Sequence, residues 1–133
     1  MTSIMETKHI TTAEIEAGIC EIRQSPKDQG VLDLIVRRPR ENEREVLETG
    51  RLDVEKGLVG DIWSIEDGNR QTQIAIMNSR TIALLARGAD RRPLAGDQLY
   101  IDLDLSGENL PAGTRLAIGG AILEITPEPH PGC

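Results

Sequence analysis

Residues 110–133, LPAGTRLAIGGAILEITPEPHPGC, decide the fold because they join two strand patterns through a tight turn. Apolar residues alternate over 116–118 and again over 121–125, which is the two-residue period of a half-buried strand. Gly119 and Gly120 lie between the two runs, where a two-residue hairpin turn needs positive φ angles. This stretch therefore predicts a β-hairpin.

A proline-rich segment follows the hairpin and ends in a cysteine. Pro127, Pro129 and Pro131 lack backbone donors, and the segment has no apolar anchor, so we expect it to be poorly ordered. Cys133 is the last residue, and His130 precedes it by three positions. The residues alone leave two interpretations of this thiol. It is either an inert terminal cysteine or a soft nucleophile whose thiolate His130 could hydrogen-bond.

Composition indicates one acidic domain, residues 1–133, with an aliphatic core. The chain has no Phe, one Trp and one Tyr, and its net charge is −7. An acidic surface argues against nucleic acid and against anionic membranes as partners. No apolar run has the length of a membrane span, and no signal peptide is visible in the first residues. These features favour the cytoplasm.

The two cysteines are expected to be reduced thiols, because cytoplasmic proteins rarely keep disulfides. A Cys20–Cys133 bridge in a secreted protein is the alternative. Cys20 lies beside the apolar stripe of a predicted helix over residues 12–24, so we expect it to be half-buried and partly shielded. Thr11 and Glu14 form a capping-box pattern at the start of this helix.

Apolar spacing predicts the remaining elements. The expected strands cover residues 31–36, 45–47, 72–77 and 99–105, with a helical turn over 52–56 and a helix over 81–87. The strand over 99–105 alternates for seven residues, which is typical of a half-buried antiparallel strand. We expect more strand than helix, and a core that includes Leu99, Ile101, Leu103, Leu105, Leu116, Ile118, Ile122 and Ile125.

Two stretches could carry polar function. The strand over 31–36 runs into Arg37 and Arg38, and four acidic residues follow by Glu48. This charge run is either an ion-paired turn or a small anion site built by the two arginines. In the second stretch, GLVGD at 57–61, two glycines allow a sharp turn, and Asp61 can accept backbone N–H bonds.

Several motifs in this order resemble the MOSC domain family, named for the C-terminal domain of molybdenum-cofactor sulfurases. The matching stretches are IVRRP at 35–39, EREVL at 43–47, GLVGD at 57–61, LAGDQL at 94–99, and the C-terminal run that ends in PHPGC. The residues in these stretches are similar to those of a short bacterial branch of the family. The resemblance covers roughly residues 12–133.

The resemblance implies a mainly β, α+β fold: an antiparallel β-barrel of the MOSC type with two or three short helices. It implies that Cys133 carries sulfane sulfur or ligates molybdenum, with His130 beside it. The expected cofactor is molybdenum cofactor, a pterin whose phosphate needs local basic groups. The expected partners are a pyridoxal-phosphate-dependent cysteine desulfurase or a protein of the molybdenum-cofactor pathway. The candidate cofactor-binding residues are Arg37, Arg38, Gly60, Asp61 and Arg70.

The chain departs from the family pattern in two places. Family members usually carry a histidine just after the aspartate of the GLVGD motif, whereas this chain has Ile62 and Trp63. Family domains also continue beyond the cysteine, so we expect a truncated domain, whose unpaired barrel edge would favour dimerisation. These departures leave a second interpretation open, in which the chain is a binding domain that has lost activity.

Overall fold

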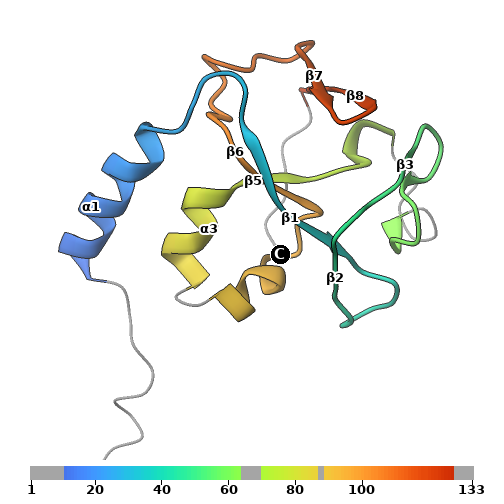
Figure 1. The fold of residues 1–133 in the computed structure, drawn as a ribbon, viewed down its shortest axis with the longest axis horizontal. Helices are drawn as coiled ribbons and strands as arrows, with labels where there is room; N and C mark the ends of the chain where they lie inside the picture. Colours follow the sequence, from blue (N-terminus) through green and yellow to red (C-terminus); the bar gives the residue numbers. More distant parts are fainter. Residues whose placement is uncertain (1–10, 64–69, 87–88, 128–133) are drawn as a thin grey trace, which may run out of the picture.

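The computed structural model describes residues 11–63, 70–86 and 89–127, and its fold is α+β (Figure 1). Strand residues outnumber α-helical residues in this part of the chain, as predicted. The helical elements are α1 (Thr12–Arg23), α3 (Ser79–Ala86) and the 3-10 helices η2 (Arg70–Thr72) and η3 (Ala89–Ala95). The strands are β1 (Val31–Arg37), β2 (Glu45–Leu47), β3 (Leu52–Asp53), β4 (Gly57–Leu58), β5 (Ile76–Asn78), β6 (Leu99–Asp102), β7 (Arg115–Ile118) and β8 (Ala121–Glu124).

The central sheet has four strands in the order β2-β1-β6-β5. Strand β1 pairs antiparallel with both β2 and β6, while β5 pairs parallel with β6. Strands β3–β4 and β7–β8 form two separate antiparallel hairpins. The predicted α+β class is confirmed, because helices and sheets are both present. Across the described ranges the three sheets do not close into a barrel.

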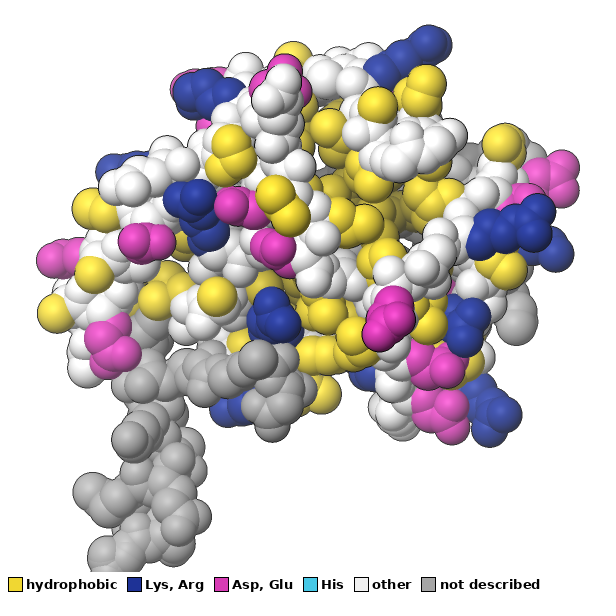
Figure 2. Space-filling view, viewed as in Figure 1, with side chains coloured by type: hydrophobic (Ala, Val, Ile, Leu, Met, Phe, Trp, Pro, Cys, Tyr) yellow, Lys and Arg dark blue, Asp and Glu magenta, His cyan; other side chains and the backbone are white. Residues whose placement is uncertain are grey.

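The core lies on both faces of the central sheet. On one face, Val36 and Tyr100 are fully buried against Ile82 and Ala86 of α3. On the other face, Ile35, Leu99 and Ile101 belong to a cluster with Leu58, and the half-buried apolar residues of β7–β8 pack against it. Figure 2 shows hydrophobic side chains gathered between β1 and β7–β8, with acidic and basic side chains scattered around them.

The strand predicted over 99–105 is shorter and more deeply buried than its pattern suggested. Strand β6 covers four residues, because the Leu103 amide turns back to the Ile101 carbonyl, 3.0 Å away. Tyr100 occupies an expected solvent-facing position but is completely buried, since α3 covers that face. Ile122, predicted to be in the core, is 69 % exposed because it lies on the outer face of the β7–β8 hairpin.

The first helix forms as predicted but buries less than expected. The Thr11 side chain accepts from the Glu14 amide, and the Glu14 side chain accepts from the Thr11 amide. Helix α1 lies on the outer side of α3, where Gly18 approaches Leu84, and it has no fully buried residue. Cys20 is exposed, so the expected shielding of its thiol is wrong.

Three further elements differ from the sequence pattern. The expected helical turn over 52–56 is instead the tip of the β3–β4 hairpin, where the Asp53 carboxylate accepts the amides of Glu55 and Lys56. In place of the strand predicted over 72–77, β5 begins only at Ile76, because Thr72 belongs to η2 and residues 73–75 have no regular structure. Helix α3 begins earlier than predicted, and the Asn78 side chain caps it by accepting the Thr81 amide.

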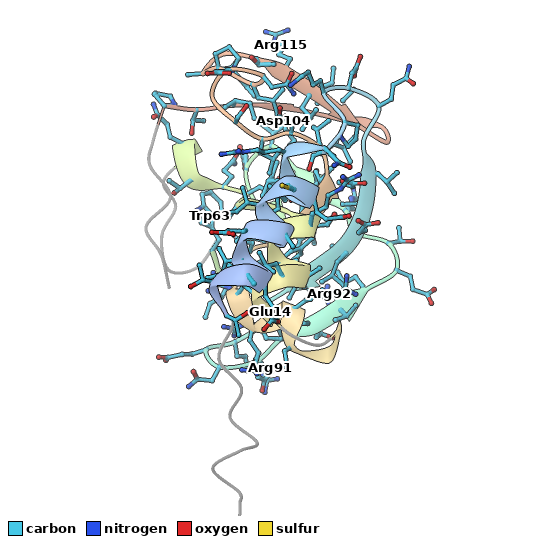
Figure 3. The ribbon with its side chains drawn as sticks, turned by 90° about the vertical axis from the view of Figure 1, so that its left-hand side faces the viewer. Glu14, Trp63, Arg91, Arg92, Asp104 and Arg115 are labelled. Carbon is cyan, nitrogen blue, oxygen red and sulfur yellow. The ribbon has the colours of Figure 1, made fainter. Side chains whose placement is uncertain are left out.

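Asp104 gives the fold an acid-sensitive contact near the end of α1 (Figure 3). Its pKa is lowered to about 2, because the Ser106 backbone amide, the Ser106 hydroxyl and the Lys27 ammonium all favour the ionised carboxylate. A lowered folded-state pKa contributes stability above the unfolded value near 3.8, and this stability is lost as pH falls through about 2.

We therefore expect Asp104→Asn to be less stable than wild type above about pH 4, and the difference to disappear towards pH 2. Urea unfolding of both proteins between pH 7 and about pH 2 measures this difference. A gap between the two proteins that stays constant over the whole range would show that ionisation of Asp104 plays no part.

Candidate functional site

The carboxylate of Asp61 organises the candidate site. Gly60 has a φ of +90°, which turns the chain after β4 and carries Asp61 into the interior, where it is 2 % exposed. One carboxylate oxygen accepts the Arg38 amide at 2.7 Å, and the other accepts the Trp63 amide at 3.1 Å and the Gln98 side-chain amide at 3.2 Å. The prediction that Asp61 accepts backbone N–H bonds is confirmed.

Asp61 brings together three segments that are far apart in the sequence. They are the end of β1, the GLVGD loop, and the segment that enters β6. Gln98 extends the network, because its side-chain oxygen accepts the Ala75 amide at 2.7 Å and its backbone carbonyl accepts the Val36 amide at 2.8 Å. The Ile62 amide also donates to the Arg38 carbonyl at 2.7 Å. A buried, hydrogen-bonded carboxylate of this kind fixes the position of each segment.

Arg37 belongs to an ion-paired turn. Two of its guanidinium nitrogens contact Glu45 Oε1, at 3.1 and 2.9 Å, and a third donates to the Val59 carbonyl at 3.4 Å. Arg40 and Glu43 form a second ion pair at 3.5 Å. A Cβ atom on Gly60 would lie 2.7 Å from Arg37 Nη1, so this glycine gives the arginine room to cross the loop. The ion-paired turn predicted for the charge run is therefore present.

Trp63 occupies the region where the family pattern places a histidine. Its side chain is 6 % exposed, and Cε3 would lie 3.5 Å from a Cβ atom added to Gly57. Gly57 has a φ of +69°, a left-handed conformation that glycine adopts without steric cost. Figure 3 shows Trp63 in the middle of the molecule, away from Arg115 at one end and Arg91 at the other. A buried indole packs the loop and offers one N–H donor, but it cannot exchange protons near neutral pH as a histidine does.

The structure brings together Arg37, Arg38, Gly60 and Asp61 out of the predicted site residues. Cys133, His130 and the predicted disorder of the chain end lie outside the described residues, as does the side chain of Arg70. Among the side chains that are described, no group of three His, Cys, Asp or Glu could hold a metal ion. Sequence reasoning missed the role of Gln98, although the LAGDQL motif contains it.

No family model, curated protein or solved structure matches this chain. Within the described ranges, no helix has both the length and the apolar character needed to cross a membrane. A functional assignment therefore depends on the sequence motifs and on the geometry around Asp61.

Proposed function

We propose that this chain is a MOSC-type domain that handles sulfur, or binds molybdenum cofactor, through Cys133. One observation carries the proposal: three of the stretches that resemble the family, at 35–39, 57–61 and 94–99, meet at the single buried carboxylate of Asp61. Motifs scattered along a chain are more informative when they share one structural unit. The proposal includes the family's barrel architecture and a cytoplasmic location.

In the sulfur-carrier form of the proposal, Cys133 accepts sulfur from a pyridoxal-phosphate-dependent cysteine desulfurase. The Cys133 thiolate attacks the outer sulfur of the desulfurase persulfide, a new S–S bond forms, and the old one breaks. The desulfurase cysteine leaves as a thiolate, and Cys133 keeps the persulfide. His130 would hydrogen-bond the thiolate and help to hold it ionised.

In the cofactor-binding form, the Cys133 thiolate would ligate molybdenum, a metal for which a soft sulfur ligand is suitable. The bound cofactor would supply the redox chemistry of the molybdenum centre. Arg38, whose amide binds Asp61, is the candidate for the phosphate of a pterin cofactor, since an acidic chain needs a local cation to attract an anion. Arg70 remains a candidate for the same role.

A second candidate function is a binding domain without catalysis. The observation that favours it is Trp63, a buried indole in the region where relatives of the proposed family carry a histidine. If that histidine takes part in proton transfer, its absence removes the step but leaves the folded loop intact. The two candidates differ in whether the chain accepts sulfur.

We expect Cys133→Ser to abolish persulfide uptake and to leave the thermal midpoint nearly unchanged, because a single thiol would carry the sulfur. Cys20→Ser is the matched control, and it is a strict one because the Cys20 thiol is exposed and thus accessible to the same sulfur donor. Each variant is incubated with a cysteine desulfurase and free cysteine. Intact-protein mass spectrometry without reductant then reports the gain of one sulfur atom.

The same spectra separate the candidate functions. Uptake by wild type and Cys20→Ser, with none by Cys133→Ser, supports the sulfur carrier. Equal uptake by wild type and Cys133→Ser would reject Cys133 as the carrier and favour the binding domain. A Cys20–Cys133 disulfide in freshly purified protein would instead favour the secreted alternative.

A further inference from the structure

Arg38 and Trp63, whose backbone amides bind Asp61, each carry a buried side-chain N–H donor without an acceptor. These donors are Arg38 Nε and Trp63 Nε1, and neither has a hydrogen-bond partner among the described residues. Leaving such a donor unpaired is costly, so buried donors are nearly always satisfied. Both donors belong to residues whose backbone amides bind the same Asp61 carboxylate. An acceptor from outside the described residues could therefore satisfy the buried donor of Arg38.

The backbone of Arg38 is fixed on both sides. Its amide donates to Asp61 at 2.7 Å, its carbonyl accepts the Ile62 amide at 2.7 Å, and Pro39 follows it. The side chain is only half-buried, so part of the guanidinium can meet a molecule from solvent while Nε stays covered. A positioned guanidinium with open donors is well suited to a planar or tetrahedral oxyanion.

Arg37 differs from its neighbour in this respect. Its guanidinium already contacts Glu45 and the Val59 carbonyl, so binding an anion there would require breaking an existing ion pair. Arg38 has no ion pair with any residue that the structure describes. The two adjacent arginines therefore differ in their hydrogen-bond partners, although the sequence alone does not distinguish them.

We propose that Arg38, and not Arg37, is the anion-binding arginine of this domain, and that it takes a tetrahedral oxyanion. The inference deepens the proposed function, and it rests on that function only for the identity of the natural ligand, the phosphate of a cofactor or a metal oxyanion. The site itself involves neither Cys133 nor His130. It can therefore be tested independently of sulfur transfer.

The test is a titration of the full chain with inorganic phosphate and, separately, with molybdate, at low salt. Trp63 is the single tryptophan, so its fluorescence reports on the Asp61 unit directly, and calorimetry gives an independent affinity. We expect saturable binding that weakens tenfold or more in Arg38→Gln, since a charge-assisted hydrogen bond contributes about 1.5–3 kcal/mol. Arg37→Gln is the matched control and should bind with nearly wild-type affinity.

Further variants make every outcome decisive. Arg38→Lys keeps the charge but loses the fork of donors, so it should bind with intermediate affinity, and it replaces Arg38→Gln if that variant does not fold. Stronger binding of phosphate supports a phosphate group as the natural ligand, and stronger binding of molybdate supports a metal oxyanion. No binding to wild type at about 10 mM, or loss of binding in Arg37→Gln alone, would overturn the inference.

The two proposals fail separately. Cys133→Ser should bind phosphate as wild type does, because only Arg38 is proposed to hold this anion. If Arg38→Gln keeps full anion affinity, the inference is wrong, whatever the sulfur assay shows. If Cys133→Ser takes up sulfur normally while Arg38→Gln loses the anion, the inference stands and the sulfur carrier is rejected.

Discussion

Asp61→Ala is expected to destabilise the domain by about 4 kcal/mol. The substitution leaves the Arg38 amide, the Trp63 amide and the Gln98 side-chain amide without their shared acceptor. Unsatisfied buried donors cost roughly 1–3 kcal/mol each, and Asp61 is 2 % exposed, so water cannot easily replace the carboxylate. Since domains of this size have a total stability of about 5–15 kcal/mol, the variant should be close to unfolding.

Asp53→Ala is the matched control, because Asp53 also accepts two backbone amides in a turn. Its hairpin tip is open to solvent, so water can take over those bonds and the loss should be much smaller. Asp61→Asn should fall between the two, since the amide keeps one acceptor but adds a donor that faces other donors. Urea unfolding of all three variants gives the comparison. Similar losses for Asp61→Ala and Asp53→Ala would show that Asp61 does not organise the site.

Local rules predicted the elements that depend on neighbouring residues alone. The capping box at Thr11 and Glu14 marks the start of α1, because both hydrogen bonds lie within one helical turn. The Gly119–Gly120 pair marks the β7–β8 turn, where Gly119 has a φ of +57°. In both cases the residues that make the structure are adjacent in the sequence, so no information from the rest of the fold is needed.

Burial was predicted less well, because it depends on what distant segments cover. Tyr100 and Ile122 both follow a period-2 pattern, yet Tyr100 is fully buried beneath α3 and Ile122 is 69 % exposed. Cys20 is exposed for a related reason, since α1 covers only the outer side of α3. Periodicity identifies the two faces of an element but cannot tell whether another element covers each face.

The candidate site shows the same division. The turn at Gly57 and the acceptor role of Asp61 follow from the GLVGD motif. The contribution of Gln98 could not be predicted, because its contact with Asp61 spans 37 positions in the chain. Nor could the sequence predict which of Arg37 and Arg38 forms an ion pair. Their difference arises only when β2 brings Glu45 beside one of them.

Ile101→Ala should cost about 2–5 kcal/mol, the usual range for truncating a fully buried aliphatic side chain. Ile101 is 4 % exposed and lies in β6, at the centre of the four-stranded sheet, between Leu32 of β1 and Asn78 of β5. It belongs to the apolar cluster that joins the sheet to the β7–β8 hairpin. The alanine variant would leave a cavity that neighbouring strands, held by hydrogen bonds on both sides, cannot easily close.

Ile122→Ala removes the same atoms from a strand and is the matched control. Because Ile122 is 69 % exposed on the outer face of its hairpin, the change should stay within about 0.5 kcal/mol. The period-2 pattern alone predicts equal losses for the two isoleucines, whereas the structure predicts a difference of at least about 1.5 kcal/mol. Chemical denaturation of both variants, with m-values compared to wild type, decides between them. Equal losses would mean that another surface covers Ile122 in solution.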